Sequence, residues 1–184
     1  MDYDKLKQNI IDVITEEQIK LGYRSESIRL YYPLSSLNRL LSENMDVRQM
    51  NQTLQQFAEE AGNLFGKIET GNKGERFCLI IPPEGADYVH GHMDRAGFIH
   101  EFIRTIEKHG CTIEELLQIF YQYSDRVHVE KTTHGGFDYL VYFEDGEPDA
   151  FRYCITDEGA HLIYHRFSPE DYEDFHFGEA DKKD

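Results

Sequence analysis

Phe137-Asp138-Tyr139-Leu140-Val141-Tyr142-Phe143 is the clearest strand pattern in the chain, and it decides the fold class. Tyr, Phe and Val fit a pleated, half-buried surface better than they fit a helix. The odd-numbered residues are expected on one face and the even-numbered residues on the other, because side chains alternate along a strand. The segments 134–136 and 144–149, on either side, carry the residue types of turns. The stretch is therefore predicted to be one strand between two turns.

Three neighbouring segments repeat this alternation, at residues 126–130, 151–155 and 160–167. Turns that contain Gly separate the four segments, so the sequence predicts a four-stranded antiparallel meander. Such a sheet usually buries one face. The predicted cover is a helical hairpin, with one helix at 95–108 and a second that starts at a capping box of Thr112 and Glu115. The expected members of this core include Phe102, Ile106, Leu117, Phe120, Tyr139, Val141 and Tyr153.

Residues 1–83 show a different order of elements. Their hydrophobic spacing and turn residues predict a helix at 5–21, a strand at 27–33, a short helix capped by Ser35 or Ser36, a helix at 46–61, and a hairpin with strands at 65–70 and 76–81 around a turn at 71–74. Pro82-Pro83-Glu84-Gly85 is expected to end the last strand.

The whole chain is thus predicted to be an α+β protein of two units. Residues 1–83 would form the N-terminal unit. Residues 84–184 would form an acidic α+β unit, in which the helical hairpin packs on the meander. The tail of this second unit is expected to be disordered from about residue 179.

The order of elements in residues 1–83 resembles a winged helix. This resemblance implies that the helix at 46–61 reads a DNA groove and that the hairpin contacts the DNA backbone. Gln can read adenine edges, and Lys and Arg can hold phosphates. The nucleic-acid contacts that the resemblance implies are Arg48, Gln52, Lys67, Lys73 and Arg76.

The C-terminal half resembles an uncharacterised bacterial family of the domain-of-unknown-function kind. Three runs carry this likeness, His100-Glu101-Phe102-Ile103, Phe137-Asp138-Tyr139 and Tyr164-His165-Arg166-Phe167. Such a family implies no activity, so the resemblance leaves the function to the residues themselves.

The charge of the chain is strongly acidic and unevenly distributed. The formal net charge is −16. Residues 1–83 carry ten Lys or Arg and twelve Asp or Glu, whereas residues 84–184 carry nine and 23. An acidic protein is repelled by phosphate backbones and by anionic membrane surfaces. The charge therefore disfavours nucleic acid and membrane as partners. It is explained either by solubility or by an acidic face that binds a basic protein partner of unknown identity.

The apolar segments, the N-terminal residues and the cysteines of the sequence together predict that the protein is located in the cytoplasm. No apolar run approaches the ~20 residues that a membrane helix needs. Met1–Lys5 opens a polar segment, so no secretory signal is expected. The three cysteines are far apart and odd in number, which is typical of a protein in a reducing compartment.

His90-Gly91-His92-Met93-Asp94 is the best candidate for a metal site. In an extended segment, His90 and His92 would lie on the same side, and Asp94 could join them. Imidazole and carboxylate are suitable ligands for zinc or another divalent metal. The spacing resembles the first half of the metallo-β-lactamase motif H-x-H-x-D-H, although Arg95 stands where that family has a further ligand His. The resemblance implies a metal-dependent hydrolase centred on these three residues.

Other catalytic patterns are missing from the sequence. It contains neither a G-x-S-x-G elbow nor a Gly-rich loop with phosphate-binding spacing. Apart from a possible divalent metal, no cofactor is expected. The prediction is a non-catalytic cytoplasmic protein that acts in regulation or through a protein partner. A DNA-binding transcriptional regulator and a metal-dependent hydrolase are the alternatives.

Overall fold

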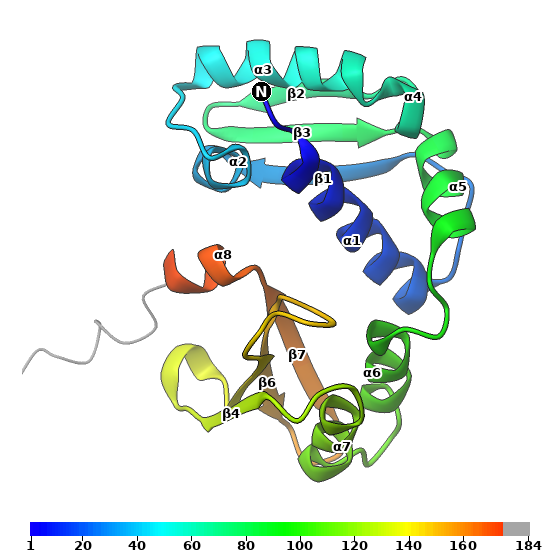
Figure 1. Ribbon diagram of the computed structural model, residues 1–184, viewed down its shortest axis with the longest axis vertical. Helices are drawn as coiled ribbons and strands as arrows, with labels where there is room; N and C mark the ends of the chain where they lie inside the picture. Colours follow the sequence, from blue (N-terminus) through cyan, green and yellow to red (C-terminus); the bar gives the residue numbers. More distant parts are fainter. Residues whose placement is uncertain (175–184) are drawn as a thin grey trace, which may run out of the picture. The chain divides into compact units, whose positions relative to one another are not determined.

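The computed structural model describes residues 1–174 and divides the chain into two units, Met1–Asp94 (unit 1) and Arg95–Asp184 (unit 2) (Figure 1). Each unit contains helices and one antiparallel sheet, so the predicted α+β class is confirmed. The disorder predicted from about residue 179 lies outside the described residues. Within residues 1–174, none of the helices has the length and apolar character needed to cross a membrane.

Unit 1 follows the predicted order of elements and adds two helices, α4 and α5. Its elements are α1 (Asp4–Leu21), β1 (Ile28–Pro33), α2 (Leu34–Leu41), α3 (Val47–Glu60), α4 (Gly62–Phe65), β2 (Glu69–Lys73), β3 (Arg76–Ile81) and α5 (Pro83–His92). The strands form one antiparallel sheet in the order β1-β3-β2. α2 begins directly after Pro33, which stands at the N-cap position, so the predicted cap at Ser35 or Ser36 is wrong.

The hairpin of unit 1 starts later than predicted. α4 forms a further helical turn and buries Phe65, so β2 begins only at Glu69. Lys73 pairs with Arg76, which leaves a tight turn of Gly74 and Glu75 instead of the predicted turn at 71–74. Gly74 has a φ of 60°, a conformation that glycine adopts without strain.

The boundary between the units lies after Asp94, later than the predicted boundary at residue 83. Pro83 occupies the first turn of α5, where its missing N–H is not needed. Ala86 and Val89 of this helix are buried in the core of unit 1. Gly85 lies so close to its surroundings that an added Cβ would clash with Ile81 Cγ2 and approach the Phe65 carbonyl oxygen to 2.9 Å. α5 therefore belongs to unit 1.

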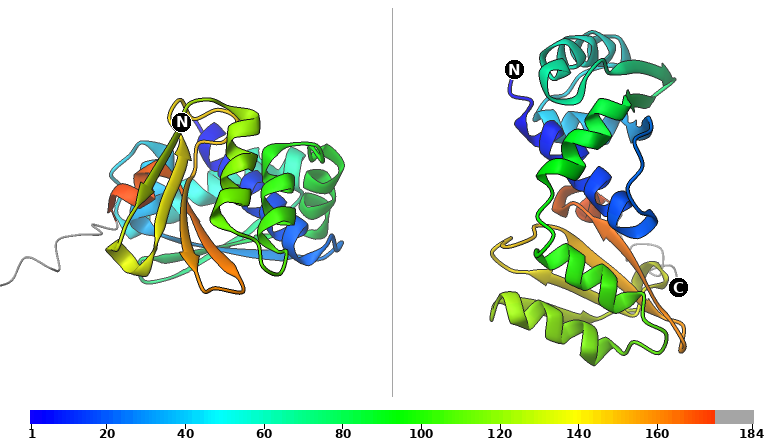
Figure 2. Two further views of the ribbon diagram at one scale, coloured as in Figure 1. Left: turned by 90° about the horizontal axis from the view of Figure 1, so that it is seen from below. Right: turned by 90° about the vertical axis from the view of Figure 1, so that its right-hand side faces the viewer.

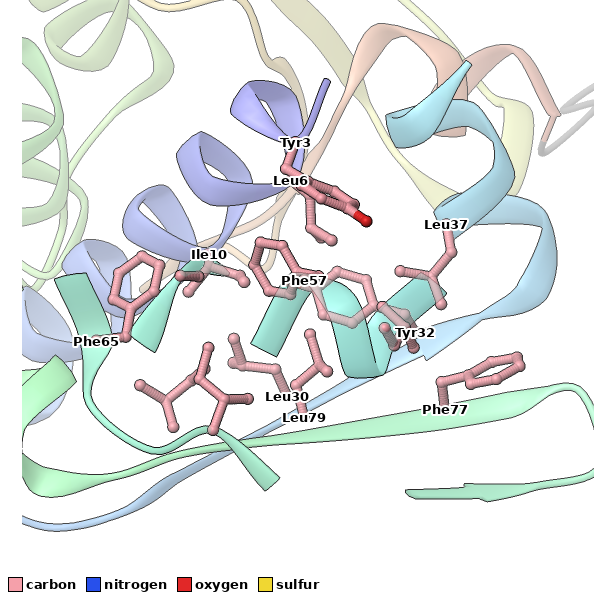
Figure 3. Packing of buried hydrophobic residues seen from close by; sticks show 14 of the residues in the cluster. Tyr3, Leu6, Ile10, Leu30, Tyr32, Leu37, Phe57, Phe65, Phe77 and Leu79 are labelled. Atoms are coloured by element: carbon pink, nitrogen blue, oxygen red, sulfur yellow. The ribbon is translucent and has the colours of Figure 1, made fainter. Parts of the chain in front are cut away.

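The core of unit 1 lies between one face of the sheet and the helices. Leu6 and Ile10 are fully buried on the inner face of α1. Figure 3 shows them beside Phe57 of α3, with Leu30 of β1 and Leu79 of β3 on the sheet side. Side chains alternate along a strand. In β1 and β3, every second residue is buried on the core side, and the residues that alternate with them point to the other face of the sheet.

Unit 2 contains the predicted meander. Its elements are α6 (Phe98–Ile106), α7 (Ile113–Tyr123), β4 (Val127–Lys131), a 3₁₀ turn (His134–Gly136), β5 (Tyr139–Phe143), β6 (Arg152–Asp157), β7 (Leu162–Phe167) and α8 (Pro169–Asp174). The strand order β4-β5-β6-β7 confirms the four-stranded antiparallel meander. The capping box at Thr112 and Glu115 is also confirmed. In Figure 2, α6 and α7 lie together against one face of this sheet.

Aromatic rings fill the core between these two helices and the sheet. Phe98 and Phe102 of α6 and Phe120 of α7 pack around Tyr153 of β6, with ring centroids 4.6 to 5.8 Å apart. Most of the predicted core residues are buried, namely Phe102, Ile106, Phe120, Val141 and Tyr153. Leu117 and Tyr139 are only partly buried.

The second face of the meander is not uniformly open to solvent. Leu140 and Cys154 are directly opposite each other on β5 and β6, and both are buried. α8 follows β7 and packs against it. Burial raises the pKa of the Tyr172 phenol on α8, and Cys154 adds to the rise. α8 therefore covers part of the face that an open meander would leave wet.

A buried ion pair joins the loop before β6 to β7. The side chains of Asp149 and Arg166 are 8% and 7% exposed, and Arg166 Nη2 donates to Asp149 Oδ2 at 3.0 Å. The Tyr153 hydroxyl donates to the same oxygen at 2.8 Å, and the Phe151 backbone N–H donates to Oδ1 at 2.8 Å. The carboxylate of Asp149 is thus the common acceptor of three groups inside unit 2.

Candidate functional site

The residues predicted to bind a metal lie at the end of α5. His90 and His92 belong to the last helical turn, so the predicted extended segment is wrong. Residues two apart on a helix point in different directions. The His90 ring stacks on Tyr23 at 3.8 Å between centroids, and the His92 ring stacks on Tyr88 at 4.2 Å. Asp94 follows the helix. In the described part of the chain, three or more His, Cys, Asp or Glu side chains do not gather into a group that could hold a metal ion.

The neighbours of His90 give this end of α5 a structural role. The Tyr23 hydroxyl donates a hydrogen bond to Asp87 Oδ1 at 2.5 Å. This bond lowers the pKa of the Asp87 carboxyl and raises the pKa of the Tyr23 phenol. Together with the stacking of His90, it fastens the segment after α1 to α5.

The residues predicted to contact nucleic acid lie on different elements. Lys73 and Arg76 are directly paired at the end of the β2–β3 hairpin. Arg48 and Gln52 are exposed on α3. Lys67, just before β2, lines a shallow groove whose other wall includes Gln55 and Glu59 of α3. The structure therefore brings Lys73 and Arg76 together, while the three others belong to the surface of α3 and its groove.

Lys73 and Arg76 form part of a larger surface on the outer face of the three-stranded sheet. The strand register places Pro33, Arg76 and Lys73 in one row across the sheet, and Tyr31, Cys78 and Gly71 in the next. Arg29, Ile80 and Glu69 form the third row. We call these nine residues the basic sheet face. Three of them are cationic and one is acidic, so this face is positive within an acidic chain.

Tyr31 occupies the middle row of the basic sheet face and is 52% exposed. The guanidinium of Arg76 lies over its ring, with Cζ 4.7 Å from the ring centroid, which is a cation–π contact. The cross-strand neighbours of Tyr31 are Cys78 and, beyond it, Gly71. Because Gly71 has no side chain, the side chains of this row leave space near Tyr31. The ring of Tyr31 and the guanidinium of Arg76 therefore remain accessible to a partner.

The sequence prediction missed Arg29 and Tyr31. The signal that could have identified them is the alternation in residues 28–33, in which Ile28, Leu30 and Tyr32 are buried and the residues between them are exposed. An alternation of this kind indicates two faces with different environments. It does not indicate that Arg76 lies beside Tyr31, because that contact depends on the pairing of β1 with β3.

The three cysteines are free thiols in different environments. Burial raises the pKa of the Cys154 thiol to about 11, and burial also raises the pKa of Cys111. The thiolate is the reactive form of cysteine, so both thiols are poor nucleophiles at neutral pH. Cys78 lies on the basic sheet face and is only partly buried.

We therefore expect one thiol of the native protein to react rapidly with a disulfide reagent at about pH 8, close to the ordinary thiol pKa. Under denaturing conditions, all three thiols should react. Cys78→Ser should abolish the rapid phase and leave the slow one, as measured by the time course of thiol release. Rapid reaction of Cys111 or Cys154 in the native protein would contradict the burial described above.

The chain was compared with known families, curated proteins and solved structures. A family model described as a domain of unknown function, "E. rectale Gene description (DUF3877)", matches residues 3–176. The match covers both units and therefore extends beyond the C-terminal half in which the family likeness was predicted. Neither a curated protein nor a solved structure matches the chain.

Proposed function

The chain belongs to the DUF3877 family of domains of unknown function, and we propose that it is a non-catalytic protein that binds an acidic segment of a partner protein on the basic sheet face. The observation that carries this proposal is the cluster of Arg29, Lys73 and Arg76 around the exposed ring of Tyr31. Arg and Tyr are enriched among the residues that dominate binding energy in protein interfaces.

The charge of this surface supports an acidic partner. The guanidinium groups of Arg29 and Arg76 can each bind a carboxylate through two parallel hydrogen bonds. Glu69 lies at the far end of the face, in the row of Arg29. The row of Arg76 and Lys73 is therefore the most positive part, and we expect the carboxylates of the partner to bind there. The free thiols support the cytoplasm as the place of this interaction.

DNA is the second candidate partner, because Lys73 and Arg76 are adjacent at the tip of the hairpin and Arg48 and Gln52 are exposed on α3. The net charge of −16 weighs against it, since a long polyanion is repelled by the whole chain. A short acidic segment of a protein experiences less of this repulsion. We therefore favour an acidic segment of a protein over DNA as the partner.

Fluorescence anisotropy of the full chain with three labelled probes tests the proposal. The probes are a short peptide rich in Asp and Glu with one Tyr, a single-stranded oligonucleotide and a double-stranded one. We expect the peptide to bind at low salt. Arg29→Ala/Arg76→Ala should weaken this binding about tenfold, equivalent to ~1.4 kcal/mol. The control Arg48→Ala/Lys67→Ala removes the same charge from α3 and its groove, and it should change the affinity less than about twofold.

Two results would reject the proposal. If the control variant weakened peptide binding as much as the sheet variant, the effect would come from net charge alone. If an oligonucleotide bound more tightly than the peptide and the control variant abolished its binding, the DNA-binding alternative would replace the proposed function.

A further inference from the structure

β2 forms an edge of the sheet of unit 1, because among the described residues only β3 pairs with it (Figure 1). Residue pairs of an antiparallel ladder alternate between those that exchange two hydrogen bonds and those that exchange none. The two-residue turn closes on a hydrogen-bonded pair, Lys73 and Arg76. The backbone N–H and C=O groups of Thr70 and Asn72 therefore point away from β3. Such an edge is a template for a further strand.

A groove lies beside this edge, between α3 and β2. Its volume is about 540 Å³, and its lining includes Ala58 of α3, Gly62 of α4, and Ile68 and Thr70 on the side of β2. Glu69, between Ile68 and Thr70, belongs to the basic sheet face, because side chains alternate along a strand. The groove and the basic sheet face thus lie on the two sides of the same strand.

The opposite edge of the sheet, β1, is less suited to a further strand. Its last residue is Pro33, which has no N–H to donate. α2 begins directly after Pro33 and packs against β1. Loop and turn hydrogen bonds between backbone groups of the described residues use none of the N–H and C=O groups of Thr70 and Asn72. β2 is therefore the edge at which a partner strand finds free backbone groups.

We propose that the acidic segment of the partner binds as an added strand along β2. This inference rests on the proposed function and specifies how the segment binds. The side chains of an added strand alternate between the two sides of the sheet. On the basic sheet face, a carboxylate beside Lys73 also reaches Arg76, and a large side chain fits over Gly71. On the other side, small or apolar side chains enter the groove beside Ala58.

Fluorescence anisotropy of the full chain with four labelled peptides tests the added strand. In the first peptide, Glu alternates with Val over about eight residues, enough to span β2. The second has the same composition in one Glu block and one Val block. The third and fourth are the first peptide with backbone N-methyl groups at the Val positions or at the Glu positions. One of these two sets of N–H groups faces β2, and the other faces solvent.

We expect the first peptide to bind about tenfold more tightly than the second, because only the first separates acidic from apolar side chains across a strand. One of the two N-methylated peptides should also bind about tenfold more weakly than the first, because it loses the hydrogen bonds to β2. The other should bind nearly as tightly as the first. Equal affinities of the two N-methylated peptides, or of the first and second peptides, would overturn the proposal.

Thr70→Pro and Thr70→Val are matched variants for the same test. Proline removes an N–H that points away from β3, so the hydrogen bonds between β2 and β3 remain, whereas valine keeps this N–H. Thr70→Pro should weaken binding of the first peptide about tenfold, and Thr70→Val should change it less than about twofold. Equal affinities of the two variants would contradict the proposal. Circular dichroism shows whether Thr70→Pro folds, and the N-methylated peptides decide if it does not.

The outcomes separate this inference from the proposed function. If Arg29→Ala/Arg76→Ala weakens the binding of all four peptides and the wild type binds all four alike, the proposed function stands and the added strand is wrong. If none of the four binds, both are wrong. Sedimentation of the protein without peptide tests a second copy as the occupant. A dimer that Thr70→Pro dissociates would show that β2 pairs with another copy of the chain, and it would reject the partner segment.

Discussion

Asp149→Ala should lower the free energy of unfolding of unit 2 by about 3–5 kcal/mol, because it removes the Asp149 carboxylate from a buried ion pair with the guanidinium of Arg166. The same change removes the acceptor of the Tyr153 hydroxyl, which is enclosed in the aromatic core. Replacing one partner of a buried ion pair is among the few single substitutions that lower the free energy of unfolding by this amount. Denaturant-dependent hydrogen exchange of peptides from β6 and β7 measures the loss within unit 2 alone.

Asp145→Ala is the matched control for this prediction. Asp145 lies in the same loop, but its side chain is 37% exposed and reaches Arg126 only at 3.9 Å. Exposed ion pairs contribute little, so this change should cost less than about 1 kcal/mol. Equal losses for the two variants would show that Asp149 and Arg166 contribute no more than a surface pair does.

Gly85→Ala should destabilise unit 1 by roughly 2–3 kcal/mol, although alanine is normally the better helix former. Its Cβ would overlap Ile81 Cγ2 and lie 2.9 Å from the Phe65 carbonyl oxygen. Phe65 and Ile81 are both fully buried, so neither can move aside without disturbing the core. Urea denaturation, followed by hydrogen exchange of α5 and β3 peptides, measures the effect.

Gly91→Ala tests whether the loss of stability in Gly85→Ala arises from the close contact of the added Cβ with Ile81 and Phe65. Gly91 lies in the same helix, and a Cβ at this position would meet no atom of the described chain within 4 Å. The substitution should therefore be neutral or stabilise α5 by up to about 1 kcal/mol. If both alanine variants stabilised unit 1, the close approach of α5 to Phe65 and Ile81 would be incorrect.

Local sequence patterns were sufficient for those parts of the fold that depend on near neighbours. The capping box of Thr112 and Glu115 forms as predicted, with both reciprocal hydrogen bonds. The four strands of the meander also form as predicted, because each pairs with the next segment along the chain. α1 matches its hydrophobic stripe closely, and it begins one residue earlier than predicted.

The predictions failed where a local pattern allows two structures. Pro82-Pro83-Glu84-Gly85 has the composition of a turn, yet proline is equally suited to the first turn of a helix. The helix buries Ala86 and Val89 in the core of unit 1, and this burial stabilises the helix relative to the turn. That helix also changes the directions of His90 and His92, so the predicted metal pattern depended on a backbone that the chain does not adopt.

The basic sheet face depends on contacts that no local pattern contains. Tyr31 lies opposite Cys78 because β1 pairs with β3, and Arg76 reaches Tyr31 only through this pairing. The residue types of the basic sheet face could be read from the sequence, but their grouping required the fold.

The strand order of unit 1 has a consequence for synthesis on the ribosome. β1 pairs with β3 alone, and the whole segment from α2 to β2 is translated between these two strands. The nascent chain therefore carries β1 without a strand partner until Arg76–Ile81 has left the exit tunnel. In unit 2, each strand after the first can pair with the strand translated just before it. The N-terminal half is thus made first but closes its sheet across the longer loop, so we expect it to complete its sheet more slowly than the C-terminal half.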